Sequence, residues 1–133
     1  MMNPLADIRQ YAPRMTISQV MKFCEKKSIG ITRAMIQNYV RIGLMPPPAD
    51  KRFYTHKHLT LMVLIDRLKT VFEIPEIKKA LAPFVDEDGL SPEIYEKIWH
   101  EAEVFAHSAE IGSNPLVAMT GLAAMKLSVQ SQL

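Results

Sequence analysis

The stretch ITRAMIQNYVRIGLMPPPADKRFY, residues 31–54, decides the fold of this chain. Thr32 is a favoured helix N-cap, because its hydroxyl can accept a hydrogen bond from a free backbone N–H of the first turn. Ile31 and Ile36 stand at the two positions of a hydrophobic staple around that cap. The pattern predicts a helix over residues 32–42.

The end of this helix is equally well marked. Gly43 favours a helix stop, because glycine adopts the left-handed conformation at little cost. The prolines at 46–48 then hold the chain extended, and Lys51 and Arg52 follow as a basic tip. We interpret residues 32–42 and 44–54 as a recognition helix followed by a wing.

The rest of the chain predicts further helices and no confident strand beyond two short ones beside the wing. Thr16 and Gln19 have the spacing of a capping box, followed by apolar residues at helical intervals. The fold class is therefore mainly α. Predicted helices begin near Thr16, Thr32, Thr55, Pro75, Pro92 and Pro115, and the predicted domains are an arm (1–15), a winged helix-turn-helix domain (16–83) and a C-terminal helical segment (90–133).

Composition limits the class of protein. The chain has 133 residues, enough for one modest core. No apolar run is long enough to span a bilayer, and the first residues do not have the pattern of a signal peptide. The single Cys24 excludes an internal disulfide and a cysteine-based metal cage, so we expect a cytoplasmic protein.

Charge is distributed unevenly along the chain. Residues 1–80 hold 14 Lys or Arg and 6 Asp or Glu, a net charge of +8, whereas residues 81–133 hold 2 and 8, a net charge of −6. A basic front half suggests a face directed at a polyanion, although a solvated surface with chance segregation would give the same count.

The polar residues of the predicted recognition helix fit DNA chemistry. Arg33, Gln37 and Arg41 recur at i, i+4 and i+8 on one face. An α-helix enters the major groove, where arginine pairs with guanine and the amides of Gln or Asn pair with adenine. The candidate DNA-contacting residues are Thr32, Arg33, Gln37, Asn38, Arg41, Lys51, Arg52, Tyr54 and Lys57, with Tyr54 included only if its hydroxyl is exposed.

From Thr16 to Leu81 the chain resembles the MerR-type winged helix-turn-helix family. The resemblance rests on the Thr16–Ile17 pair, Tyr39 in the second helix, and the run Gly43, Leu44, Met45, Pro46. It also rests on Arg52-x-Tyr54 and on the terminal pattern of Ile77, Lys78 and Leu81. The chain is similar, too, to an uncharacterised bacterial family that carries this domain with a short C-terminal extension. The resemblance implies a dimeric transcriptional regulator that binds double-stranded DNA.

The sequence departs from that family at the middle of the recognition helix. Gln37 and Asn38 replace the family's Arg-Tyr pair, and the wing is shorter. An alternative therefore stays open: a protein-interaction adaptor that keeps the fold and has lost DNA binding. We find no catalytic constellation, so no enzyme is expected, and no cofactor or metal; His56 and His58 point in different directions on a helix. A small-molecule effector is left unspecified.

The C-terminal segment predicts self-association. An apolar stripe runs along the helix that begins at Pro92, and the stretch 111–125 carries no charge. An exposed apolar surface of this kind favours a homodimer, and the alternative is that it packs on the preceding domain. In MerR-type proteins the helix after the DNA-binding domain pairs with its twin, which gives the candidate interface Ile94, Tyr95, Ile98, Trp99, Ala102 and Phe105.

Overall fold

The computed structural model describes residues 5–108, so the predicted helix after Pro115 lies outside the described residues. The described chain is mainly helical and has no strand, as the sequence predicts at this coarse level. Its elements are the 3-10 helix η1 (Ile8–Gln10) and the α-helices α1 (Ile17–Lys26), α2 (Arg33–Arg41), α3 (His56–Leu68), α4 (Ile74–Leu81) and α5 (Pro92–Ser108). No helix within this range has the length and apolar character needed to cross a bilayer.

Side-chain caps fix where the first two helices begin. The Thr16 backbone N–H donates to the Gln19 side chain at 2.8 Å, which confirms the predicted capping box of α1. The Thr32 hydroxyl accepts from the backbone N–H of Met35 at 3.2 Å and caps α2. Ile31 and Ile36 are both buried beside this cap, as expected of a hydrophobic staple.

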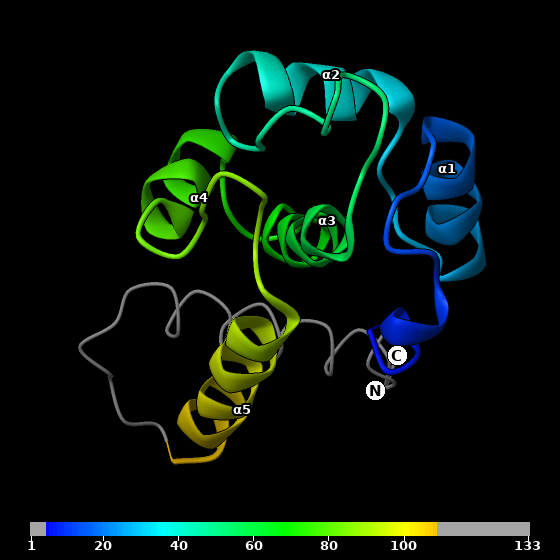
Figure 1. The fold of residues 1–133 in the computed structure, drawn as a ribbon. Coiled ribbons are helices and arrows are strands. Elements are labelled where there is room, and N and C mark those ends of the chain that lie inside the picture. The colour runs from blue at the N-terminus through cyan, green and yellow to red at the C-terminus, as the bar shows by residue number, and fades with distance from the viewer. Residues whose placement is uncertain (1–4, 109–133) are drawn as a thin grey trace.

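Helix α3 is the centre of the fold. Figure 1 shows α1, α2 and α4 arranged around α3, with α5 on the side of α3 away from α2. Ten of the thirteen residues of α3 are buried, so it is surrounded by its neighbours rather than lying on a surface. It ends at Leu68, where the chain turns to reach the extended N-cap Glu73 of α4.

The N-terminal residues are part of the core, and the predicted loose arm over 1–15 is wrong for its described part. Leu5, Ile8 and Met15 are buried in the same hydrophobic cluster as α3. Met15 and Tyr54 exchange two backbone hydrogen bonds of 2.8 Å, which tie this segment to the chain just before α3. This segment packs on the core because of a long-range pairing that no local pattern in the sequence predicts.

The segment from residue 90 onward also packs on the same core rather than forming a separate unit. The Leu90 backbone N–H donates to the Lys57 carbonyl at 3.1 Å, and Leu90 is completely buried. Tyr95 and Ile98 of α5 belong to the same cluster of buried residues. The described residues therefore share one hydrophobic core, and the predicted boundary between 83 and 90 does not divide it.

The loop from α2 to α3 ends in a tight hairpin. Ala49 and Phe53 form an isolated antiparallel bridge, with the Ala49 N–H 2.7 Å from the Phe53 carbonyl. Asp50 and Lys51 both have positive φ angles, 53° and 61°, and the Arg52 N–H donates back to the Ala49 carbonyl. This is the geometry of a type I′ turn. We call residues 49–53 the hairpin tip; it replaces the two short strands that the sequence suggested.

Candidate nucleic-acid interface

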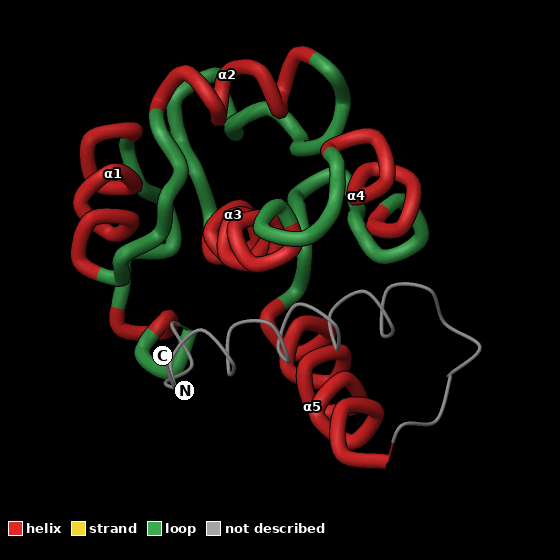
Figure 2. Tube along the Cα trace, turned by 180° about the vertical axis from the view of Figure 1, so that it is seen from behind, coloured by secondary structure: helices red, strands yellow, loops and turns green. Residues whose placement is uncertain are grey.

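The outward face of α2 carries cations and amides without a carboxylate. Arg33, Gln37, Asn38 and Arg41 are all exposed, as the sequence predicted. The inner side of the helix holds Ile36 and Tyr39. Because α2 contains no Asp or Glu, nothing on the helix itself neutralises the two arginines. Figure 2, seen from behind, again places this helix and α5 on opposite sides of α3.

The two amides of this face are not equivalent. The Asn38 side-chain oxygen accepts a hydrogen bond from the Arg41 guanidinium, so its acceptor is already used. The Gln37 side chain makes no hydrogen bond with another described residue, so both its donor and its acceptor are available. Reading adenine needs a donor and an acceptor from one amide. Gln37 is therefore better suited than Asn38 to an adenine edge.

The hairpin tip presents two more cations. Lys51 and Arg52 are exposed, and neither forms an ion pair with a described residue. Lys51 holds a positive φ that a residue with a side chain rarely adopts, which places local strain in the turn. The turn aims both side chains away from the core.

Arg14 joins this tip, and the sequence analysis did not identify it. Its guanidinium lies 4.3 Å from the centre of the Phe53 ring, and that of Arg52 lies 5.5 Å from the same ring. Arg14 also donates to the Asp50 carboxylate. The only signal in the sequence is the charge of Arg14, because its approach to the tip depends on the distant pairing of Met15 with Tyr54.

The side chain of Tyr54 is buried and is not accessible to a ligand. Only 8% of it is exposed, and its ring packs edge-on against His58 at 5.3 Å. Burial raises the pKa of the Tyr54 hydroxyl, while the nearby Arg33 acts in the opposite direction. The condition attached to Tyr54 in the sequence analysis is therefore not met.

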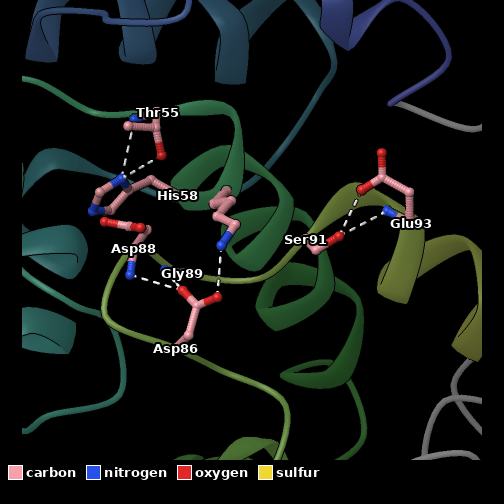
Figure 3. A network of polar contacts seen from close by, with 8 residues as sticks. Thr55, His58, Asp86, Asp88, Gly89, Ser91 and Glu93 are labelled. Atoms are coloured by element: carbon pink, nitrogen blue, oxygen red, sulfur yellow. Dashed lines mark hydrogen bonds and ion pairs between the residues drawn. The ribbon is translucent and has the colours of Figure 1, made fainter.

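Lys57 is held by the acidic loop and is not a free cation. Its ammonium lies 2.6 Å from the Asp86 carboxylate, and this bond raises the pKa of Lys57 and lowers that of Asp86 (Figure 3). The same loop is folded around Asp86, which also accepts from the backbone N–H groups of Asp88 and Gly89. Because an internal carboxylate pairs with Lys57, the structure gives no support to its predicted phosphate contact.

His58 has a structural role at the base of the hairpin loop. The Thr55 N–H donates to His58 Nδ1 at 3.0 Å, so Nε2 carries the proton and donates to the Pro47 carbonyl at 3.1 Å. Burial lowers the pKa of His58 and favours this neutral form. Figure 3 shows His58 beside Thr55, the N-cap residue of α3, from whose backbone N–H it accepts a hydrogen bond. The histidine thus joins the start of α3 to the chain that leads into the hairpin tip.

The residues predicted to form a dimer interface are mostly used inside the protomer. Tyr95, Ile98 and Ala102 are buried, because α5 turns this face toward α3. Arg67 of α3 lies over the ring of Trp99 at 4.6 Å and restrains that side chain as well. Ile94 and Trp99 are half-buried, and the side chain of Phe105 lies outside the described residues. The interface assigned to this stripe is therefore wrong for its three buried residues.

The described region shows neither a metal-ligand cluster nor a reactive cysteine. Within residues 5–108, no three His, Cys, Asp or Glu side chains are grouped as a metal site would need. Cys24 is buried, and burial raises the pKa of its thiol to about 11, which suppresses the reactive thiolate. Cys24 is therefore a small residue of the hydrophobic core.

Comparison with known proteins places the chain in a family without assigning it an activity. Neither curated proteins nor solved structures gave a match. A family described as a domain of unknown function, DUF1836, matches residues 9–99. This match runs from the N-terminal segment into the first half of α5, across the boundaries that the sequence suggested at residues 16 and 90. Because it covers more than half of the sequence, the chain belongs to the DUF1836 family.

Proposed function

We propose that this protein is a cytoplasmic, sequence-specific DNA-binding regulator with a MerR-like winged helix-turn-helix. In this proposal α2 is the recognition helix and the hairpin tip is the wing. One observation carries it: the outward face of α2 and the tip expose Arg33, Arg41, Lys51 and Arg52, and none of them forms an ion pair with a described residue. Such a surface suits a polyanion of regular shape.

Each side chain has a role that follows from its surroundings. Gln37 would read an adenine edge in the major groove, and Arg33, at the first turn of α2, would pair with guanine or with phosphate. Arg41, Lys51 and Arg52 would contact phosphates, with Arg14 as an additional contact beside the tip. Thr32, already the N-cap, has a hydroxyl hydrogen left for a phosphate oxygen. Lys57 and Tyr54 are not part of this interface.

Salt dependence gives the first test. Five cations, Arg14, Arg33, Arg41, Lys51 and Arg52, are within the proposed surface. If four or five of them meet phosphates, the logarithm of the binding constant falls with the logarithm of salt at a slope of about −4. Fluorescence anisotropy with duplex DNA between low and moderate salt measures this slope. A protein that does not bind duplex DNA at low salt would instead favour the adaptor function.

A charge-matched pair of variants tests the location of the surface. We expect Arg33→Ala with Arg52→Ala to weaken DNA binding by about tenfold to a hundredfold at low salt, because two exposed cations are removed. Arg9 and Lys97 are also exposed, and Arg9 pairs with Glu93 of α5. Arg9→Ala with Lys97→Ala removes the same charge from the opposite side and should leave affinity within about twofold. Equal losses in the two double variants would rule out the assigned face.

Sequence specificity is tested separately from affinity. Selection of bound duplexes from a random pool, followed by genomic footprinting, would supply a preferred site. Gln37→Ala should then reduce the preference at one or two base pairs by about tenfold, and leave binding to random DNA nearly unchanged. Asn38→Ala should have a smaller effect on base preference, because its amide oxygen already accepts from Arg41.

The proposal retains a homodimer on a pseudo-palindromic site, but without the apolar stripe of α5 as its interface. The exposed positions of the helix between residues 93 and 101 are charged or polar, namely Glu93, Glu96, Lys97, His100 and Glu101. Light scattering of the full chain, free and on its selected site, measures the stoichiometry. One protein per site at saturation would remove the dimer from the proposal.

A further inference from the structure

An apolar groove lies behind the α2 face, outside the proposed DNA-binding surface. Its volume is about 370 Å³, and it is formed between the C-terminal part of α2, the chain at 44–47, and the end of α4 with the turn that follows. This volume is near the lower end of the range for small-molecule sites. The groove walls are largely apolar and include Val40, Leu44, Met45, Pro47, Leu81 and Val85.

Two charged residues line the groove, and only one of them is available to a ligand. Asp86 is committed: its carboxylate accepts from the Lys57 ammonium and from two backbone N–H groups of its own loop. Lys78 is exposed and forms no ion pair with a described residue. The groove therefore combines an apolar body with one free positive charge.

Lys78 is not needed to complete the end of α2. Its ammonium lies about 3.6 Å from the position that a Cβ on Gly43 would occupy, directly beside the end of that helix. Three of the last four carbonyls of α2 already have backbone partners, since Asn38, Tyr39 and Val40 accept from the N–H groups of residues 42–45. The charge of Lys78 therefore remains available to an anionic group at the edge of the groove.

We propose that this groove binds a small organic acid with one carboxylate and an apolar chain or ring. The carboxylate pairs with the Lys78 ammonium, and the apolar part lies against Val40, Leu44 and Leu81. A cationic ligand fits less well, because the only carboxylate of the groove already holds Lys57. Arg33, Gln37 and Arg41 do not line the groove, so the ligand leaves these outward residues uncovered. The proposal does not depend on DNA binding.

The test uses simple acids as probes of the full chain. Octanoate, phenylpropanoate and phenylbutyrate are titrated, each beside the alcohol and the amine of the same skeleton, while the methyl signals of Val40, Leu44, Leu81 and Val85 are followed by NMR. We expect at least one acid to shift these signals with a Kd between about 0.05 and 5 mM, as its size allows. Its alcohol and amine should bind more weakly.

Two neighbouring lysines of α4 provide matched variants. Lys78→Gln should weaken binding of the acid by about threefold to fivefold, because an exposed charge pair is lost. Lys79 is exposed but does not line the groove, so Lys79→Gln should leave the Kd unchanged. The proposal is overturned if no acid shifts the methyl signals at about 10 mM, a concentration that would detect even a weak small ligand. An amine that binds as tightly as its acid, or equal effects of the two substitutions, would also overturn it.

Discussion

The cations on the two sides of α3 have different environments. On the side of α2, Arg33 and Arg52 are exposed and meet no carboxylate of the described chain. Away from that face, Lys57 is bound to Asp86 of the loop between α4 and α5, and Arg67 of α3 is buried over the Trp99 ring of α5. The second arrangement joins segments of one protomer, whereas the first leaves its positive charge exposed. The comparison shows that a basic sequence is a weak guide to a basic surface, because internal carboxylates select which cations remain free.

The largest effect we expect concerns the stability of the loop that carries Asp86 and Gly89, between α4 and α5. Gly89 has a φ of +124°, and a Cβ there would lie 2.7 Å from the backbone carbon and oxygen of Lys57. Gly89→Ala must displace the loop that carries Asp86 or the first turn of α3. We expect the free energy of unfolding to fall by about 2 to 4 kcal/mol, measured by urea denaturation.

Gly30→Ala is the matched control for this prediction. Its Cβ would meet only the ends of two flexible side chains, those of Asp66 and Lys69, at 3.4 Å. A φ in the left-handed range is not needed there, so the free energy of unfolding should change by less than about 1 kcal/mol. Similar losses for both variants would show that the close backbone approach of Gly89 is not what makes its position sensitive.

The sequence predicts local structure well where one short pattern carries the information. The Thr16–Gln19 box, the Thr32 cap with its isoleucine staple, and the stop at Gly43 each involve residues within a few positions of one another. The exposed side of α2 follows from the same periodicity. These features could be predicted because helix capping and amphipathic spacing are decided within one or two turns.

The structure differs from the sequence-based predictions where residues distant in the sequence meet. Lys57 is 29 positions from Asp86, so the charge of the loop gave no sign of its target. The apolar stripe of α5 indicated burial correctly, but periodicity does not distinguish a neighbouring helix from a second protomer. Arg14 was missed for the same reason, because its place beside the hairpin tip depends on the pairing of Met15 with Tyr54.

A second prediction concerns how the free energy of unfolding depends on pH through His58, which joins the start of α3 to the chain that leads into the hairpin tip. Burial lowers the pKa of His58 in the folded state, so the unfolded chain binds the proton more readily. The stabilising contribution is complete above the unfolded value of about 6.5 and is lost as pH falls from there toward the lowered folded pKa. We therefore expect the free energy of unfolding to decrease between pH 7.5 and pH 5, measured by urea denaturation at each pH.

The variant His58→Gln distinguishes the capping hydrogen bond at the start of α3 from the effect of protonating His58. Glutamine fills the same position in the Thr16 box, where Gln19 accepts from the Thr16 N–H at 2.8 Å. The variant should keep the cap of α3, lose about 1 kcal/mol with the bond to Pro47, and show a flatter pH profile. His100→Gln, at an exposed position of α5, should retain the slope of the unmodified protein. An unchanged slope in His58→Gln would assign the pH dependence to other groups.

The smallest effect tests whether the hairpin tip limits its own positive charge. Asp50 lies between the cations of the tip and accepts from Arg14, with both side chains largely exposed. Asp50→Asn removes this negative charge, and asparagine tolerates the positive φ of the turn. DNA affinity should rise by about twofold to fivefold at low salt, because an exposed pair of this kind contributes up to about 1 kcal/mol.

Asp7→Asn removes a charge from the ion pair with Lys27, away from the tip, and affinity should not change. If the two substitutions raise affinity equally, the net charge of the protein rather than the tip determines binding, and the contrast between the two sides of α3 loses its functional meaning.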